Sequence, residues 1–192
     1  MQLKKRFTAK TVQLLVVDLQ ERLLPVISGE SIVRANARRL IQAARWLEID
    51  CLATEQYPKG LGSSVADIAE VYAAQVVEKM TFSAVGPESV RYWLEPDQAV
   101  VLAGIETHVC IAQTAFDLIE MGMTVLLPVD AVSSRNRSDH DVAVTRMTQA
   151  GVIPTTTEAL LFEWLGSAEH PQFKAISKMV KEFQPMSNPF TN

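Results

Sequence analysis

Short apolar runs alternate with longer segments of helical period along this chain, and the alternation limits the folds that the chain can adopt. The runs occupy residues 12–18, 50–54, 74–79, 99–104, 123–130 and 151–156. They are apolar almost throughout, as strands are when helices cover both faces of a parallel sheet. Residues 31–49 place most of their apolar side chains on one side and predict an amphipathic crossover helix. The pattern predicts a Rossmann-like, three-layer α/β/α fold with a central, mostly parallel six-stranded sheet.

The length and composition of the chain predict one domain. The 192 residues are 48% hydrophobic and 21% charged, which lets one compact domain bury most of its apolar surface. We expect a single domain over residues 1–192, with a core over about 10–182 and a loose, proline-containing tail at 183–192.

Charge and hydropathy narrow the choice of partners. The formal net charge is −4, and the longest basic block is Lys4–Arg6, so we expect neither a nucleic acid nor a membrane as partner. The apolar runs fall well short of the ~20 residues that span a bilayer, and the N-terminus lacks the apolar core of a signal peptide. The sequence favours a cytoplasmic protein that binds a small-molecule substrate.

Three reactive side chains stand at or just beyond the ends of predicted strands, where ligands of an open parallel sheet collect. Asp18 ends the first run, Lys79 ends the third, and Cys110 follows the fourth after a short turn. Each also has an ordinary explanation: a loop cap for Asp18, a solvated strand end for Lys79, and a buried, inert thiol for Cys110. Their joint occurrence predicts an active site.

Cys110 is the most informative of the three because of its place in a predicted helix. Thr107 is the expected N-cap, which puts Cys110 in the first helical turn. The positive field at a helix N-terminus favours thiolate over thiol. The other cysteine, Cys51, lies inside a predicted strand with no charged partner in the pattern, and we interpret it as a buried, inert thiol.

A thiol, a carboxylate and an ammonium group supply the parts of a covalent hydrolase. The sulfur attacks a carbonyl carbon, the carboxylate carries the proton to the leaving amine, and the ammonium stabilises the anionic forms. Backbone N–H groups from about Glu106 to Cys110 are candidates for holding the oxyanion. His108 is a poor candidate for the base, because side chains two positions apart on a helix diverge.

The sequence gives no indication of a metal or a cofactor. His108, His140 and His170 are far apart and show no metal-binding spacing. The chain has no G-x-S-x-G elbow, and no glycine-rich fingerprint follows the first run. We therefore expect a site that uses neither.

Three segments resemble the motifs of the isochorismatase-like cysteine hydrolase superfamily. They are "LLVVDLQERLLP" at 14–25, "EKMTFSA" at 78–84 and "GIETHVCI" at 104–111. The segments "TEQYPKGLG", "DAVSSR" and "HPQFKAI" look closest to the branch of isochorismatase-domain-containing proteins. The resemblance implies the isochorismatase-like hydrolase fold, with Asp18 as general base and acid, Lys79 as positioning cation and Cys110 as covalent nucleophile.

The resemblance also implies features around these residues. A cis peptide between Ile105 and Glu106 would turn the amide of Glu106 toward the oxyanion, beside the amide of Cys110. Family members are often homo-oligomers, so we expect a dimer or a tetramer. The expected pocket residues neighbour the motifs at the same sheet edge, although each could equally be packing: Gln20, Tyr57, Phe82 and Ile105.

Departures from the family pattern narrow the expected substrate. Nicotinamidases carry an aspartate and histidines after the second strand that bind a metal beside the substrate ring, whereas "TEQYPKG" here contains no histidine. Cys110 argues against the vinyl ether hydrolysis of true isochorismatases. A small amide or carbamoyl compound remains the expected substrate of an amidohydrolase. A binding protein without catalytic activity and a thiol that senses oxidants are the alternatives, the latter with Cys51 as resolving thiol.

Overall fold

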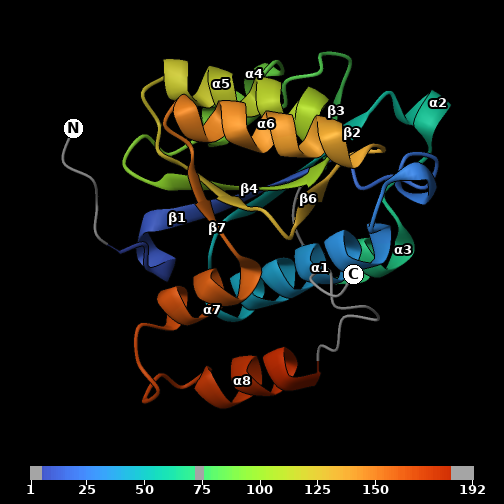
Figure 1. The fold of residues 1–192 in the computed structure, drawn as a ribbon. Helices are drawn as coiled ribbons and strands as arrows, with labels where there is room; N and C mark the ends of the chain where they lie inside the picture. The colour runs from blue at the N-terminus through green and yellow to red at the C-terminus, as the bar shows by residue number, and fades with distance from the viewer. Residues whose placement is uncertain (1–5, 72–75, 183–192) are drawn as a thin grey trace.

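One parallel sheet lies between two layers of helices (Figure 1). The structure is a computed structural model that describes residues 6–71 and 76–182. The strands run in the order β3-β2-β1-β4-β5-β7, with β6 beside the end of β4, and every pairing between them is parallel. Their bounds are β1 (Val12–Val17), β2 (Cys51–Gln56), β3 (Val76–Lys79), β4 (Ala99–Ile105), β5 (Val125–Pro128), β6 (Val132–Ser133) and β7 (Ile153–Thr155). The predicted three-layer α/β/α fold is confirmed.

The sheet has seven strands where the sequence predicted six. The additional strand β6 has two residues and pairs with Gly104 and Ile105. Two residues are too few to show a period, so the sequence pattern could not reveal this strand. The first two residues of the strand predicted at 74–79 lie outside the described residues, as does the tail predicted at 183–192. The assignment of residues 1–192 to one domain stays a prediction.

Different helices cover the two faces of the sheet (Figure 1). On one face lie α4 (Glu88–Trp93), α5 (Ala112–Glu120) and α6 (Arg137–Gln149). On the other lie α1 (Glu30–Trp46), α3 (Ala66–Val71) and α7 (Thr157–Leu165), with α8 (Phe173–Glu182) packed outside α7. Shorter elements are α2 (Pro58–Leu61), η1 (Ala9–Thr11), η2 (Leu24–Val26) and the π-helical turn η3 (Thr107–Ile111). Within the described ranges, no helix combines the length and apolar character needed to cross a membrane.

Strand β1 explains why the apolar runs do not alternate with polar residues. Leu14 and Val16 belong to the core cluster on the α1 and α7 side, whereas Leu15 and Val17 belong to the cluster on the α5 and α6 side. All four side chains are at most 1% exposed. Both faces of the strand are therefore buried, and both require apolar residues.

Close packing of β1 against β4 fixes the edge at which the candidate residues meet. Gly104 pairs with Val17, and a Cβ atom added to Gly104 would collide with the backbone oxygen of Val17. Gly104 also has a φ of 122°, a conformation that L residues with side chains rarely adopt. The two strands consequently run in close contact up to Asp18, the residue after Val17.

Candidate active site

Asp18 and Lys79 form a fully buried ion pair at the carboxyl edge of the sheet. Lys79 Nζ lies 2.7 Å from Asp18 Oδ2, and both side chains have no exposed surface. Asp18 follows β1 with a φ of 55°, a left-handed conformation that aspartate tolerates better than most residues. A buried charge is costly without a partner, so each of these side chains depends on the other.

Strand β2 lies between β1 and β3 and supplies two further contacts to the pair. Thr54 Oγ1 donates to Asp18 Oδ1 at 2.8 Å, and Gln56 Oε1 accepts from Lys79 Nζ at 2.8 Å. The carbonyl oxygens of Thr81 and Phe82 also accept from Nζ, at 3.2 and 3.1 Å. Both oxygens of the Asp18 carboxylate are therefore held in place.

The sequence pattern did not assign a role to Thr54 or Gln56. Both lie at the end of β2, where the segment "TEQYPKG" follows an apolar run. The signal was a polar residue at the carboxyl end of a strand, the same signal that identified Asp18 and Lys79. This signal could identify Thr54 and Gln56 only once the strand order was known, because the order shows that β2 lies between the strands of the two charged residues.

Cys110 reaches the ion pair from the turn η3. Cys110 is only 7% exposed. The Asp18 carboxylate and the backbone amide of Glu106 both lie close enough to act on the thiol. The structure thus brings together Asp18, Lys79 and Cys110, which come from the ends of three different strands.

Burial raises the pKa of Cys110 to about 12, and the nearby charge of Asp18 adds to the rise. Lys79 and the amide of Glu106 act in the opposite direction, with smaller effect. The helix field favours a thiolate, but desolvation and the charge of Asp18 act against it and favour the thiol. Burial also raises the pKa of Asp18, against the lowering effect of Lys79, Thr54 and Cys110.

Thr107 does not cap the helix that carries Cys110. Its Oγ1 lies 3.0 Å from His140 Nδ1, and Glu106 occupies the position before the turn. The peptide bond between Ile105 and Glu106 is cis, as the family resemblance implies. The amide of His108 donates to Ser134 Oγ at 3.4 Å and that of Val109 to the Glu106 carbonyl at 3.1 Å. The amides of Glu106 and Cys110 stay the proposed oxyanion donors.

Two of the four expected pocket residues are part of the framework. Gln20 is fully buried; its amide nitrogen donates to the carbonyls of Gln56 and Gly62, and its oxygen accepts from the amide of Gln56. Ile105 is also fully buried, in the core on the α1 side. The loops and the core already use these two side chains, and their place in the pocket lining stays a prediction.

The other two expected pocket residues are exposed. Tyr57 is 47% exposed and Phe82 is 55% exposed, while Met80 between them in the chain is 72% exposed. A cavity of about 340 Å³ opens beside Tyr57, Met80 and the backbone of Lys79. Tyr57 and Phe82 therefore remain available to contact a substrate, and that role stays a prediction.

The two glutamates near the motifs have partners of their own. Glu55 Oε1 accepts from the amide and the hydroxyl of Ser64, at 2.6 and 2.8 Å. Glu106 Oε2 accepts from the amide and Nε of Arg135, at 3.2 and 3.1 Å. Glu55 fastens the loop after β2, whereas Glu106 binds the segment after β6.

A larger cavity of about 740 Å³ lies away from these residues, between α1, α3 and α8. Its lining includes Arg34, Arg38 and Trp46 but none of Asp18, Lys79 or Cys110. In the parts of the chain that the structure describes, no three metal-ligating side chains come together. The candidate chemistry therefore rests on the buried ion pair and the thiol.

Cys51 lies far from Cys110 along the sheet. Leu14 pairs with Cys51 on one side and with Val101 on the other, so Cys51 lies level with Val101. Strand β4 continues for four residues beyond that level, about 13 Å at the rise of a strand, before the chain turns toward Cys110. Cα atoms joined by a disulfide lie within about 7 Å, so the two cysteines do not form a bond in this fold.

Comparison with known proteins identifies the family. The isochorismatase domain model matches residues 12–159. The isochorismatase domain-containing protein 2 of Danio rerio is 42% identical over 94% of this chain and 92% of its own length. The isochorismatase domain-containing protein 1 of Salmo salar is also 42% identical, over 88% of this chain, but the match spans only 61% of that protein.

A solved structure supports the same assignment. The MAR1 ribonuclease of Caenorhabditis elegans has a TM-score of 0.88 and 38% identity, covering 97% of this chain and 99% of its own. Sequence motifs, domain match and fold agree over most of the described residues. The chain therefore belongs to the isochorismatase family and has the hydrolase fold of that family.

Proposed function

We propose that this protein is a cysteine amidohydrolase that cleaves a small amide or carbamoyl C–N bond through an acyl-enzyme on Cys110. The observation that carries the proposal is the position of the Cys110 thiol beside a carboxylate that is itself paired with a buried lysine. A nucleophile, a base and a group that orients the base form the minimal set for covalent acyl transfer.

The first half-reaction uses Asp18 as the base. Cys110 Sγ attacks the carbonyl carbon while Asp18 takes the thiol proton, so a stable thiolate is not required beforehand. The raised pKa of Asp18 suits this role, because a stronger base accepts a proton more readily near neutral pH. The tetrahedral oxyanion accepts hydrogen bonds from the backbone amides of Glu106 and Cys110. As the C–N bond breaks, Asp18 passes its proton to the leaving nitrogen.

The second half-reaction uses the same groups with water as nucleophile. Asp18 takes a proton from a water molecule as the oxygen of that water attacks the thioester carbon. Collapse of the second tetrahedral intermediate breaks the C–S bond, and the proton returns from Asp18 to the sulfur. Lys79 takes no part in the proton transfers and holds the carboxylate in place for both steps, with Nζ 2.7 Å from Asp18 Oδ2.

The distance between the two cysteines favours amide hydrolysis over the oxidant-sensing alternative. The position of Cys51 level with Val101 prevents it from acting as the resolving thiol of Cys110 within one chain. A binding role without catalysis uses neither the thiol proton nor the orientation of Asp18. These contacts therefore favour turnover over simple binding.

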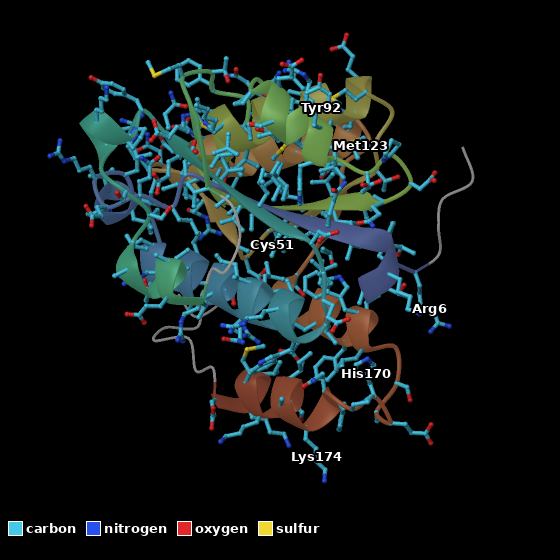
Figure 2. The ribbon with its side chains drawn as sticks, turned by 180° about the vertical axis from the view of Figure 1, so that it is seen from behind. Arg6, Cys51, Tyr92, Met123, His170 and Lys174 are labelled. Carbon is cyan, nitrogen blue, oxygen red and sulfur yellow. The ribbon has the colours of Figure 1, made fainter. Side chains whose placement is uncertain are left out.

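The name of the Caenorhabditis elegans neighbour raises RNA as a competing substrate. The net charge of −4 disfavours a polyanion, because backbone contacts to a nucleic acid depend on lysine and arginine. We propose a small molecule and a cytoplasmic location. We also propose a homo-oligomer: Tyr92, which Figure 2 shows beside α4, is 79% exposed, and Phe162 on α7 is 38% exposed. A concentration-independent monomer mass in light scattering would contradict the oligomer.

The direct test is ammonia release from a panel of small primary amides and carbamoyl compounds. Cys110→Ser should lower turnover at least ~1,000-fold, as removal of a nucleophile does. Cys51→Ser is the matched control and should keep wild-type turnover. Acid quench during turnover, followed by mass spectrometry, should place the acyl group on Cys110.

The same assay separates the alternatives. Full turnover by Cys110→Ser on the best substrate would contradict the proposal. Cleavage of a single-stranded RNA that is lost in Cys110→Ser, with no amide hydrolysed, would assign the site to the competing reaction. Tight binding of an amide without any turnover would favour the binding protein.

A further inference from the structure

Thr114 makes two hydrogen bonds that join the nucleophile to the loop that holds the lysine. Its Oγ1 donates to the carbonyl oxygen of Cys110 at 2.6 Å and accepts from the amide of Ala84 at 2.8 Å. Thr114 and Ala84 both have no exposed surface. One buried hydroxyl therefore connects the turn η3 with the segment after β3.

The segment that contains Ala84 also contacts Lys79. The carbonyls of Thr81 and Phe82 accept from Lys79 Nζ, and Ala84 follows two residues later. Lys79 in turn lies 2.7 Å from Asp18. The chain of contacts runs from the backbone of Cys110 through Thr114 and this loop to the ion pair.

Ordinary helix packing does not require this arrangement. A threonine hydroxyl often donates to the carbonyl four residues earlier in a helix, and Thr148 does so to Val144 at 2.9 Å on the exposed side of α6. Thr114 makes the same bond and adds a second one, to an amide from another part of the chain. That second bond fixes the position of η3 relative to the loop.

We infer that Thr114 is a positioning residue that holds Cys110 in register with the Asp18–Lys79 pair. The inference rests on the proposed function of Cys110 and Asp18. Thr114 would then be a third residue that supports the site, besides Thr54 and Gln56. Thr114 touches neither substrate nor reacting atoms, so it acts through the backbone of Cys110. Loss of the hydroxyl would let the sulfur move relative to the carboxylate.

The test measures how strongly Asp18 and Cys110 interact, without any substrate. Alkylation of Cys110 by iodoacetamide is followed at each pH by mass spectrometry, with Cys51 in the same molecules as reference. Two charged groups face the sulfur, Asp18 from the end of β1 and Lys79 from the end of β3. Asp18→Asn should raise the Cys110 rate about tenfold for each unit by which its pKa falls.

The response to Asp18→Asn is then compared in three backgrounds. In the wild-type and Thr114→Ser backgrounds, the substitution should change the Cys110 rate by about tenfold or more, because both keep the hydroxyl. In the Thr114→Val background, the change should shrink to less than about threefold, since the sulfur no longer lies in register with residue 18. Thr148→Val, which loses only a bond within its helix, should behave as the wild type.

The possible failures are distinct. If Asp18→Asn changes the rate in the wild type and equally in Thr114→Val, the positioning role is refuted while the proposed function stands. If Asp18→Asn leaves the wild-type rate unchanged, the two groups do not interact and both proposals fail. If Thr114→Val does not fold by circular dichroism, the comparison of Thr114→Ser with Thr114→Ala replaces it, because these differ only in the hydroxyl.

Discussion

The 2.7 Å contact between Lys79 Nζ and Asp18 Oδ2 spans strand β2, because Lys79 ends β3 and Asp18 follows β1. The lysine side chain crosses one whole strand and contacts the side chain of Gln56 there. Neither charge is exposed. The candidate site is therefore organised around an internal ion pair, and Cys110 joins it from the turn η3 that follows β4.

Asp18→Asn should have opposite effects on two properties of Cys110. Hydrolysis should fall by about 10²–10⁴-fold, because the base is lost. Alkylation by iodoacetamide near pH 8 should become faster, because the charge of Asp18 is one of the causes that raise the pKa of Cys110 to about 12. The rate rises about tenfold per unit by which the pKa falls. Ammonia release measures the hydrolysis and site-resolved mass spectrometry measures the alkylation; Asp50→Asn, at an exposed position, is the matched control. Slower alkylation in Asp18→Asn would contradict the assignment.

Lys79→Met should destabilise the fold strongly. Removal of one partner leaves the carboxylate of Asp18 buried without a counter-charge, which costs about 3–5 kcal/mol. The double variant Asp18→Asn with Lys79→Met should recover most of that loss, because no charge remains buried. Urea unfolding measures both. Arg137→Met breaks the exposed pair with Asp141 and should cost less than about 1 kcal/mol. Equal stability losses in the single and double variants would refute the account.

Acidification should weaken the fold through His140. Burial lowers the pKa of His140 below its usual value, so the unfolded chain binds a proton at a higher pH than the folded chain. The stability contribution of His140 is therefore present above about pH 6.5 and is lost as the pH falls through the folded pKa. The loss should stay below about 1 kcal/mol, because the half-buried ring is screened by solvent.

Urea unfolding between pH 7.5 and pH 5 measures this effect. His140→Gln should reduce the dependence of the unfolding free energy on pH over that window. His170→Gln, at the other end of the molecule before α8, is the control and should keep the wild-type dependence (Figure 2). An unchanged dependence in His140→Gln would show that another group is responsible.

Gly104→Ala should destabilise the sheet beside Asp18. The added Cβ atom would collide with the backbone of Val17, where β1 and β4 run together. The expected loss exceeds about 2 kcal/mol, because backbone strain and overpacking act together. Gly151→Ala is the matched control: its φ is 105°, but no atom lies within 4 Å of the new Cβ. Thermal unfolding should therefore separate strain alone from strain with collision, and equal losses would contradict the close approach.

Much of the fold could be predicted from the sequence because its physical causes are local. The strand β1 is buried on both faces, and its sequence is consequently apolar at every position from Val12 to Val17 except Gln13. Asp18, Lys79 and Cys110 were identifiable because parallel strands present their carboxyl ends at one edge. The two-residue strand β6 was not readable, since it owes its existence to the end of β4 and not to a pattern of its own.

The remaining properties of the site depend on the order of the strands and on burial. Thr54 and Gln56 became partners of the ion pair because β2 lies between β1 and β3, which no local pattern encodes. The sequence placed Cys110 in the field of a helix, which favours the thiolate, whereas desolvation and the adjacent Asp18 raise its pKa to about 12. Sequence alone determined which chemical groups meet at the sheet edge. Tertiary structure decided their protonation and their partners, because both depend on distance and solvent exclusion in three dimensions.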